Sequence, residues 1–223
     1  MNDQIQKRII VDIDNTLWNL APVLWEHLKA LNPKIPPPPE WSYWDFWQEF
    51  VTTKDLYQVL RNIHMQQEKY TPYPESKPFL EALKKRDFYI IIASHRERKT
   101  LDPTVNWLKQ NGLLFDEVHL SHDKSVLFAD SWAIIDDSPI TLDKATKAGI
   151  RRVGLLNPWN ANSAHPLFDN LFEVLRYIES LDGQPKPCRS QKGDKKLSSI
   201  RSGMVEETPE ILWKSLNKKV SRR

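Results

Sequence analysis

Short apolar runs rich in β-branched residues recur along the chain and predict the strands of a buried sheet. These runs occupy residues 8–12, 88–93, 117–120, 132–135 and 152–156. Helical patterns lie between them, at residues 78–85, 102–110, 140–148 and 167–181. Strands that alternate with helices of this length indicate an α/β fold, in which helices cover both faces of a parallel sheet.

The segment between the first two predicted strands breaks this alternation, because it contains helical patterns and no strand pattern. Residues 22–31 and 54–65 are predicted to be helical, and the stiff proline-rich run IPPPPE lies between them. We therefore predict a helical cap at residues 18–73, inserted into a core made of residues 1–17 and 74–182.

Aromatic residues are concentrated in this predicted cap. Five of them fall within the seven residues from Trp41 to Trp47. The cluster could form the core of a small helical module, or it could present flat rings to a flat ligand. We expect the group Trp44, Phe46 and Trp47 to contribute substrate-binding contacts.

The composition does not change the predicted fold, but it excludes several classes of protein. Hydrophobic residues make up 40% of the chain and charged residues 27%, which is ordinary for a globular protein. No apolar run approaches the roughly 20 residues of a membrane span, and the N-terminus has no secretory pattern, so we expect a cytoplasmic protein without a membrane partner. Cys188 is the only cysteine, which excludes an internal disulfide and a cysteine-based zinc site.

Basic charge is concentrated at the C-terminus. Residues 183–223 hold 11 Lys or Arg and 4 Asp or Glu, whereas the rest of the chain has an acidic excess. This tail has few large apolar residues, and we predict that it is disordered. Its charge could add salt-sensitive affinity for an anionic partner such as nucleic acid.

Polar residues follow several of the predicted strands directly. They are Asp12, Asp14, Thr16, Ser94, Arg96, Asp136 and Asp137, and Lys124 lies shortly before the fourth strand. Because ligands bind at the carboxyl ends of the strands in an open parallel sheet, we expect these side chains to form one site.

The residue types of this set predict phosphate chemistry. Converging carboxylates repel each other unless a cation joins them, and Mg²⁺ prefers hard oxygen ligands. Asp12 could attack phosphorus and form an acyl phosphate, while Asp14 could act as general acid. Ser94 and Lys124 could bind the phosphoryl group. Each residue alone could instead cap a turn or carry a solvated charge; their occurrence together, each at a strand end, favours the functional interpretation.

Four motifs in this order resemble the haloacid dehalogenase superfamily. They are DIDNTL, IIIAS, the lysine at position 124 and IIDDSP. The resemblance implies a Rossmann-like core and an aspartyl-phosphate intermediate. By position, Asp12 would be nucleophile and metal ligand. Asp14 would be acid and base, with its backbone carbonyl on the metal, and Asp136 would be the other protein ligand. Thr16 and Asp137 would support the site.

Within this superfamily, the stretch SHDKSVLFADSWAIIDDSPITL is similar to the 5′(3′)-deoxyribonucleotidases. That similarity implies a nucleoside monophosphate as the small phosphorylated substrate, with cap aromatics around its base. The loop after the second motif departs from the relatives, which often carry a phosphate-binding lysine there. Arg96 or Arg98 could replace this lysine, and we assign phosphate binding to Arg96, whereas Glu97 would repel phosphate.

Other functions are left open by the residues. SHRE resembles the second-motif loop of the phosphatase domains of polynucleotide kinase-phosphatases, so a phosphatase acting on the 3′-end of a nucleic acid is an alternative, with the basic tail as polymer contact. A sugar-phosphate substrate is another. A binding or scaffold protein with a silent fold is disfavoured by the intact set of candidate residues. The sequence also leaves open a homodimer.

Overall fold

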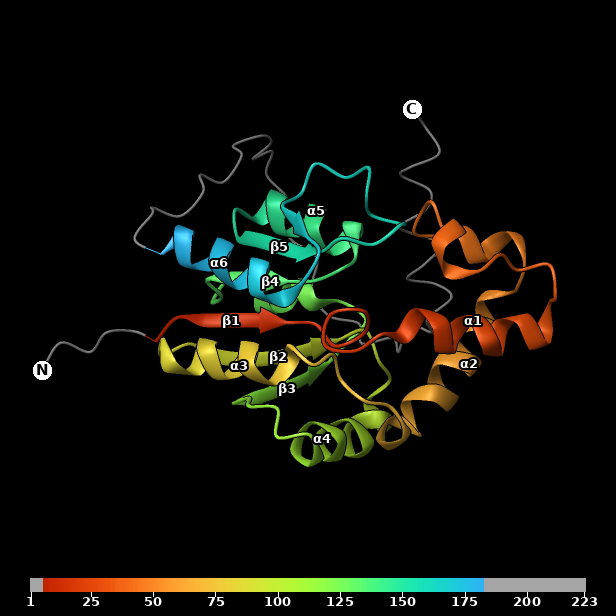
Figure 1. Cartoon of the computed structure of the whole chain (residues 1–223), viewed down its shortest axis with the longest axis horizontal. Coiled ribbons are helices and arrows are strands. Elements are labelled where there is room, and N and C mark those ends of the chain that lie inside the picture. The colour runs from red at the N-terminus through yellow and green to blue at the C-terminus, as the bar shows by residue number, and fades with distance from the viewer. Residues whose placement is uncertain (1–5, 183–223) are drawn as a thin grey trace, which may run out of the picture. The chain divides into compact units, whose positions relative to one another are not determined.

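The computed structural model describes residues 6–182, and the tail for which we predict disorder, residues 183–223, lies outside this range. A six-stranded sheet runs through the described part, with neighbouring strands parallel and in the order β3-β2-β1-β4-β5-β6 (Figure 1). The strands are β1 (Arg8–Val11), β2 (Tyr89–Ser94), β3 (Glu117–Leu120), β4 (Ala133–Ile135), β5 (Arg151–Leu155) and β6 (Leu167–Phe168).

Helices flank this sheet and fill the segment between β1 and β2. The α-helices are α1 (Leu20–Leu31), α2 (Thr53–His64), α3 (Ser76–Lys85), α4 (Leu101–Gln110), α5 (Pro139–Ala148) and α6 (Leu171–Leu181). Short 3₁₀ helices are η1 (Pro38–Glu40), η2 (Phe46–Glu49), η3 (Gln67–Lys69), η4 (Arg98–Thr100) and η5 (Lys124–Leu127). The predicted α/β fold with a helical insertion after the first strand is confirmed.

The central strands are apolar in their interior because the sheet is covered on both faces. Ile9 and Ile10 on β1, together with Ile91 and Ile92 on β2, are completely inaccessible to solvent. These strands therefore carry continuous apolar runs rather than an alternating pattern, which is why the sequence identified them directly.

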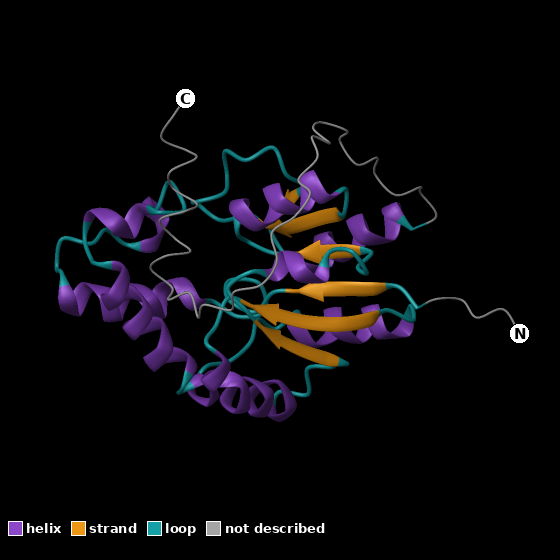
Figure 2. Ribbon diagram, turned by 180° about the vertical axis from the view of Figure 1, so that it is seen from behind, coloured by secondary structure: helices purple, strands orange, loops and turns teal. Residues whose placement is uncertain are grey.

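The helical insertion lies beyond the carboxyl ends of the central strands. Figures 1 and 2 both show the strand arrows pointing toward α1 and α2, which contact each other. Helix α2 begins at a Thr52 cap, whose side chain accepts a hydrogen bond from the Asp55 amide, and it buries Val59 and Ile63. The insertion thus lies on the side of the sheet where ligands bind in this type of fold.

One predicted helix begins too early. We expected a helix from Leu167, but Leu167 and Phe168 form β6 beside β5, and α6 begins at Leu171. The Asn170 side chain accepts a hydrogen bond from the amide of Glu173 and starts the helix there. No helix within residues 6–182 is both long and apolar enough to cross a membrane.

Gly154 on β5 is required for close contact with the backbone that follows β4. A Cβ atom at this position would lie 2.1 Å from the carbonyl oxygen of Asp136. Any larger residue would push away the segment that carries Asp136. The absence of a side chain on one strand therefore fixes the position of a candidate site residue on its neighbour.

We expect Gly154→Ala to destabilise the protein by about 1–3 kcal/mol and to weaken binding of a divalent cation. Gly112→Ala is the matched control, because Gly112 lies at φ +62 in a turn next to the flexible Lys77 side chain. That control should cost about 1–2 kcal/mol through its backbone conformation but leave cation binding unchanged. Urea unfolding and titration calorimetry measure the two effects, and equal cation affinity in both variants would contradict the prediction.

Candidate active site

The order and register of the strands bring the predicted site residues to one edge of the sheet. Strand β1 lies between β2 and β4, and its last residue, Val11, is paired with Ile92 on one side and Ile135 on the other. Asp12 follows directly, and its amide donates to the carbonyl oxygen of Ile135 at 2.9 Å. Asp136, the residue after β4, is therefore adjacent to Asp12.

Asp12, Lys124 and Asp136 form a buried ionic group at this edge. The Lys124 Nζ donates to Oδ1 of Asp12 and, at 2.7 Å, to Oδ2 of Asp136. The other Asp136 oxygen, Oδ1, accepts from the amide of Ser138 at 2.9 Å. Asp123, the residue before Lys124, begins the helix η5, because its side chain accepts a hydrogen bond from the amide of Ser125. This helix start determines the position of Lys124. The structure thus places Lys124 on the candidate nucleophile.

Three carboxylates of this edge could hold a metal ion together. Asp12, Asp136 and Asp137 each offer one oxygen, and these oxygens lie within 4.8 Å of one another. The Oδ2 atom of Asp137 is buried and has no hydrogen-bond partner among residues 6–182. If all three are ionised, Lys124 leaves a net charge of −2, which one divalent cation would balance. Hard oxygen donors and this charge fit a divalent metal ion.

Asp12 and Asp137 hold protons more strongly than ordinary carboxyl groups, because this buried group has more negative than positive charge. Burial raises the pKa of the Asp12 carboxyl to about 7; Lys124 opposes this change, and the charges of Asp136 and Asp14 add to it. Burial and the charges of Asp12 and Asp136 raise the pKa of Asp137 well above its usual value. A proton therefore competes with a cation for these oxygens.

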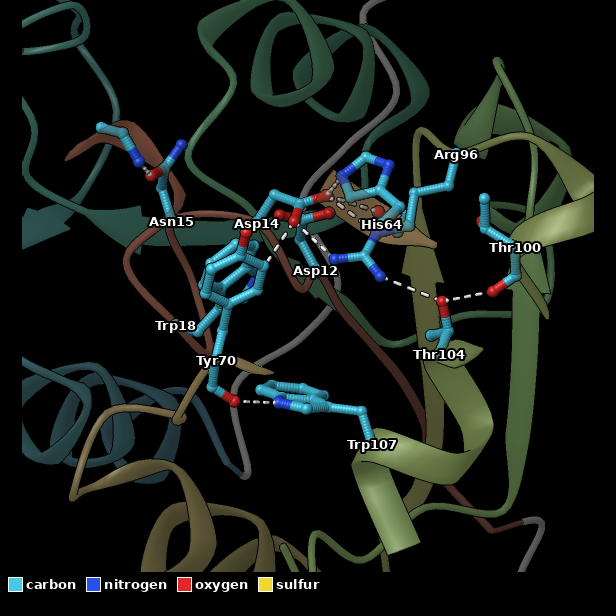
Figure 3. Close-up of polar contacts among 12 residues, drawn as sticks. Asp12, Asp14, Asn15, Trp18, His64, Tyr70, Arg96, Thr100, Thr104 and Trp107 are labelled. Atoms are coloured by element: carbon cyan, nitrogen blue, oxygen red, sulfur yellow. Dashed lines mark hydrogen bonds and ion pairs between the residues drawn. The ribbon is translucent and has the colours of Figure 1, made fainter. Parts of the chain in front are cut away.

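Asp14 belongs to a second ionic group, separate from the first. Arg96 donates to both of its oxygens, from Nε at 3.0 Å and from Nη2 at 2.5 Å. Trp18 Nε1 and Ser94 Oγ donate to it at 2.9 Å and 3.1 Å, and Nε2 of His64 on α2 lies 3.3 Å away. Figure 3 shows Arg96, Trp18 and His64 converging on Asp14 beside Asp12.

The pKa of Asp14 is held well below its usual value. Burial acts to raise this pKa, but the charges of Arg96 and His64 and their hydrogen bonds outweigh it. Burial lowers the pKa of His64 in turn, and the Arg96 charge acts in the same direction. Asp14 and Asp12 therefore have pKa values that are moved in opposite directions, although they are two residues apart.

Arg96 lies in a different environment from the one we expected. Its side chain is completely buried, and Nη1 donates to Oγ1 of Thr104 at 3.0 Å, so each of its three nitrogens contacts protein. The predicted phosphate ligand is thus engaged with Asp14. Thr16 is also completely buried, and its Oγ1 has no hydrogen-bond partner in the described part of the chain.

Asn15 was not singled out from the sequence but shapes the turn after β1. Its φ of 56 places it in the left-handed region, which Asn tolerates better than most residues. Its Oδ1 accepts a hydrogen bond from the amide of Ala21 at 2.9 Å, in the first turn of α1. The residue between Asp14 and Thr16 therefore joins the strand end to the helical insertion.

Glu97, which would repel phosphate if free, is paired with cations from two elements. Arg61 on α2 donates to its Oε1 from Nε at 2.8 Å and from Nη2 at 2.6 Å, and Lys99 Nζ lies 3.0 Å from Oε2. Burial acts to raise the pKa of Glu97, but the hydrogen bonds from Arg61 and Lys99 lower it overall. The negative charge of Glu97 is therefore balanced by Arg61 of the insertion, which the sequence did not indicate.

Two of the predicted substrate-binding aromatics, Trp44 and Phe46, belong to a ring cluster that extends through Trp41 to Trp159 of the core. Phe46 and Trp47 are buried, and the Phe46 ring is stacked on Trp41 with centroids 4.1 Å apart. Trp44 is half-buried, and its ring meets Trp159 edge-on at 6.5 Å. The stacking role of the three stays a prediction, for which Trp44 has the most accessible ring.

Trp159, which the sequence did not indicate, follows β5 and lies next to a residue anchored in the site. Asn160 is buried and donates from Nδ2 to the backbone carbonyl of Asp137 and to that of Leu155, each at 2.9 Å. The aromatic cluster is thus connected to the loop that carries Asp137.

A second group of rings consists of Tyr57 on α2, His95, which follows Ser94, and His122, two residues before Lys124. The centroids of His95 and His122 are 4.7 Å apart, and the Tyr57 hydroxyl lies 3.3 Å from Nε2 of His95. Both histidines are exposed. This group offers accessible ring faces close to the strand ends.

Comparison with solved structures shows which fold this is. A haloacid dehalogenase-like hydrolase from Streptococcus pneumoniae aligns with a TM-score of 0.55 and 14% identity, over 77% of this chain and 98% of that one. A predicted phosphoglycolate phosphatase from Haemophilus somnus gives 0.55 and 19%, over 77% and 97%. A haloacid dehalogenase-like hydrolase from Xanthomonas campestris gives 0.51 and 14%, over 82% and 95%. The chain therefore has the haloacid dehalogenase fold.

Comparison by sequence alone gives no match for this chain. No protein-family model matches the chain, and no curated protein sequence matches it either.

We predict that ionisation of Asp12 acts to destabilise the metal-free protein as the pH rises from about 5 to about 7. Asp12 ionises near 3.8 when unfolded but near 7 when folded, so the native state binds more protons in this interval. The free energy of unfolding should fall by at most about 1.4 kcal/mol per pH unit for this group, and Asp137 acts in the same direction. The stabilising effect of the lowered Asp14 pKa is complete above about pH 5. The lowered pKa values of His64, His95 and His122 act in the opposite direction to Asp12 in this interval, so the contribution of Asp12 is measured as the difference from Asp12→Asn.

Urea unfolding at several pH values, with and without excess MgCl₂, measures this slope. A bound cation favours ionised carboxylates, so Mg²⁺ should flatten the curve. Asp12→Asn cannot titrate at this position, so relative to this variant the unaltered metal-free protein should lose stability as the pH rises from about 5 to about 7. The same pH dependence in both proteins would contradict the prediction.

Proposed function

We propose that this protein is a magnesium-dependent phosphatase that hydrolyses a phosphomonoester through an aspartyl-phosphate intermediate on Asp12. The observation that carries the proposal is the buried group of Asp12, Lys124, Asp136 and Asp137, placed at the carboxyl edge of a haloacid dehalogenase fold. The names of the structural neighbours, which include hydrolases and a predicted phosphatase, support the same reaction class.

In this proposal, a carboxylate oxygen of Asp12 attacks phosphorus, and the bond from phosphorus to the leaving oxygen breaks. Lys124 holds Asp12 in place and offers positive charge to the phosphoryl oxygens. The Ser94 hydroxyl, at the end of β2, can donate to a phosphoryl oxygen. Asp12, Asp136 and the Asp14 carbonyl would hold Mg²⁺, with Asp137 in support, and the ion would supply positive charge to the phosphoryl group.

Asp14 completes both halves of the proposed cycle. As acid it gives a proton to the leaving alkoxide, and as base it takes a proton from the water that attacks the phosphorus of the intermediate, which releases Asp12 and inorganic phosphate. Arg96 and His64 favour the ionised form of Asp14 before substrate binds. A bound phosphate would bring negative charge beside it and act to raise its pKa, so proton uptake is expected to accompany binding.

We further propose a nucleoside monophosphate as the substrate. Accessible rings on both sides of the site support this choice: Trp44 in the insertion, and His95 with His122 at the ends of β2 and β3. A nucleobase can stack on such rings, whereas a sugar phosphate has no flat face to match them.

Asp12→Asn should abolish magnesium-dependent phosphate release, by at least about 10³-fold in kcat, because the amide is a poor nucleophile. Asp143→Asn is the matched control, since Asp143 is an exposed carboxylate on α5 with its side chain 65% accessible. It should retain normal activity. Phosphate release from a panel of nucleotides and sugar phosphates measures both, with circular dichroism to verify folding. Normal turnover by Asp12→Asn would refute the nucleophile assignment.

Trp44→Ala should raise KM for a nucleoside monophosphate about 5- to 150-fold, because stacking on a base contributes about 1–3 kcal/mol. KM for a small sugar phosphate should change less than about twofold. The control is Tyr43→Ala, which removes the exposed neighbouring ring. Equal changes of KM for both substrates would argue against base recognition by Trp44.

A further inference from the structure

Helix α2 presents three polar side chains to the active-site edge in one stripe. Tyr57, Arg61 and His64 are spaced at i, i+4 and i+7, so they lie on the same side of the helix. Each reaches a residue of the site edge: Tyr57 and Arg61 contact the loop 95–97 that follows β2, and His64 contacts Asp14. These three side chains therefore connect α2 to the loop 95–97 and to Asp14.

The contact between Arg61 and Glu97 is the strongest of the three. Two guanidinium nitrogens of Arg61 donate to the same Glu97 oxygen, at 2.8 Å and 2.6 Å. The two side chains are 34% and 25% exposed, so the pair is partly shielded from water. Arg61 is itself held on the helix, because its Nη1 donates to Gln58 at 3.1 Å.

The loop connects this pair directly to Asp14. Glu97 contacts α2, whereas its neighbour Arg96 is completely buried and contacts Asp14. Thr100 Oγ1 donates to the Glu97 carbonyl at 2.8 Å, and Thr104 Oγ1 donates to the Thr100 carbonyl at 2.8 Å. Thr104 in turn accepts from Arg96, as Figure 3 shows. A continuous hydrogen-bonded path therefore joins Glu97 to the side chain that clamps Asp14.

We propose that Arg61 is a positioning residue: through Glu97 it holds the loop 95–97 so that Arg96 keeps the Asp14 carboxylate in a single orientation. The inference rests on the proposed function, in which Asp14 transfers the proton to the leaving group. Arg61 itself touches neither Asp12 nor Asp14 in the contacts of residues 6–182, so its effect on the reaction passes through the loop.

Leaving-group dependence distinguishes this role from a general loss of structure. A nucleoside 5′-monophosphate releases an alkoxide that needs a proton, whereas p-nitrophenyl phosphate releases a stable phenolate that does not. A misplaced Asp14 therefore slows transfer of the phosphoryl group to Asp12 from the first substrate and spares that step for the second, whereas hydrolysis of the intermediate, in which Asp14 is the base, is slowed for both. General acid catalysis contributes about 10²–10⁴-fold in rate, and loss of orientation should remove part of that.

The test compares Arg61→Ala with the unaltered protein on both substrates in the presence of Mg²⁺. We expect kcat/KM for the nucleotide, which reports the steps up to departure of the leaving group, to fall about 10- to 100-fold. For p-nitrophenyl phosphate, kcat/KM should change less than about threefold. Arg61→Lys keeps the charge but loses the paired donors, so its kcat/KM for the nucleotide should be intermediate.

Lys99→Ala is the matched control, because Lys99 also pairs with Glu97 but is 53% exposed and lies outside α2. It should behave like the unaltered protein on both substrates. Amide hydrogen exchange of residues 94–100 gives a readout without turnover, and it should be faster in Arg61→Ala and unchanged in Lys99→Ala. Melting curves identify any variant that does not fold.

An equal fall in kcat/KM for both substrates in Arg61→Ala, or unchanged hydrogen exchange in this loop, would overturn the positioning role. If the unaltered protein releases phosphate from neither substrate, the proposed function fails instead. The exchange measurement then still decides whether Arg61 orders the loop.

Discussion

Negative charge packed at one edge of a parallel sheet is the constraint on which the rest of this structure depends. Asp12, Asp136 and Asp137 lie together in the protein interior, and Asp14 lies nearby with its side chain 16% exposed. Burial of ionised carboxylates is expensive unless partners compensate them. The chain supplies Lys124 to the first three and Arg96 to Asp14. The first group is left with too little positive charge, and the second is fully paired.

This division gives the two aspartates of the first motif opposite chemical properties. The pKa of Asp12 is raised to about 7, whereas that of Asp14 is lowered well below its usual value. A nucleophile must be ionised and a general acid must be protonated, so these two pKa values are the reverse of what the proposed reaction requires. A divalent cation would favour ionised Asp12, and a bound phosphate would favour protonated Asp14. The proposed reaction thus needs both ligands present before either residue has its working protonation state.

The parts of this arrangement that are local in sequence were predictable, and the parts that depend on distant contacts were not. Strand β1 and the position of Asp12 follow from an apolar run and the general geometry of parallel sheets. The partner of Arg96 does not, because phosphate and a carboxylate attract a guanidinium equally and only the fold decides which lies closer. Asn170 carried a local capping signal with Glu173 that would have corrected the start of α6.

The insertion contacts both halves of this edge, which makes it more than a cover for the site. On one side, Trp44 and Trp41 meet Trp159, whose neighbour Asn160 is bonded to the Asp137 carbonyl. On the other side, α2 reaches Asp14 and the loop after β2. The carboxylate group that would hold the cation and the carboxylate that would move the proton are therefore each connected to the same helical segment. Because packed elements move as units rather than deforming continuously, a displacement of this segment would be transmitted to both groups.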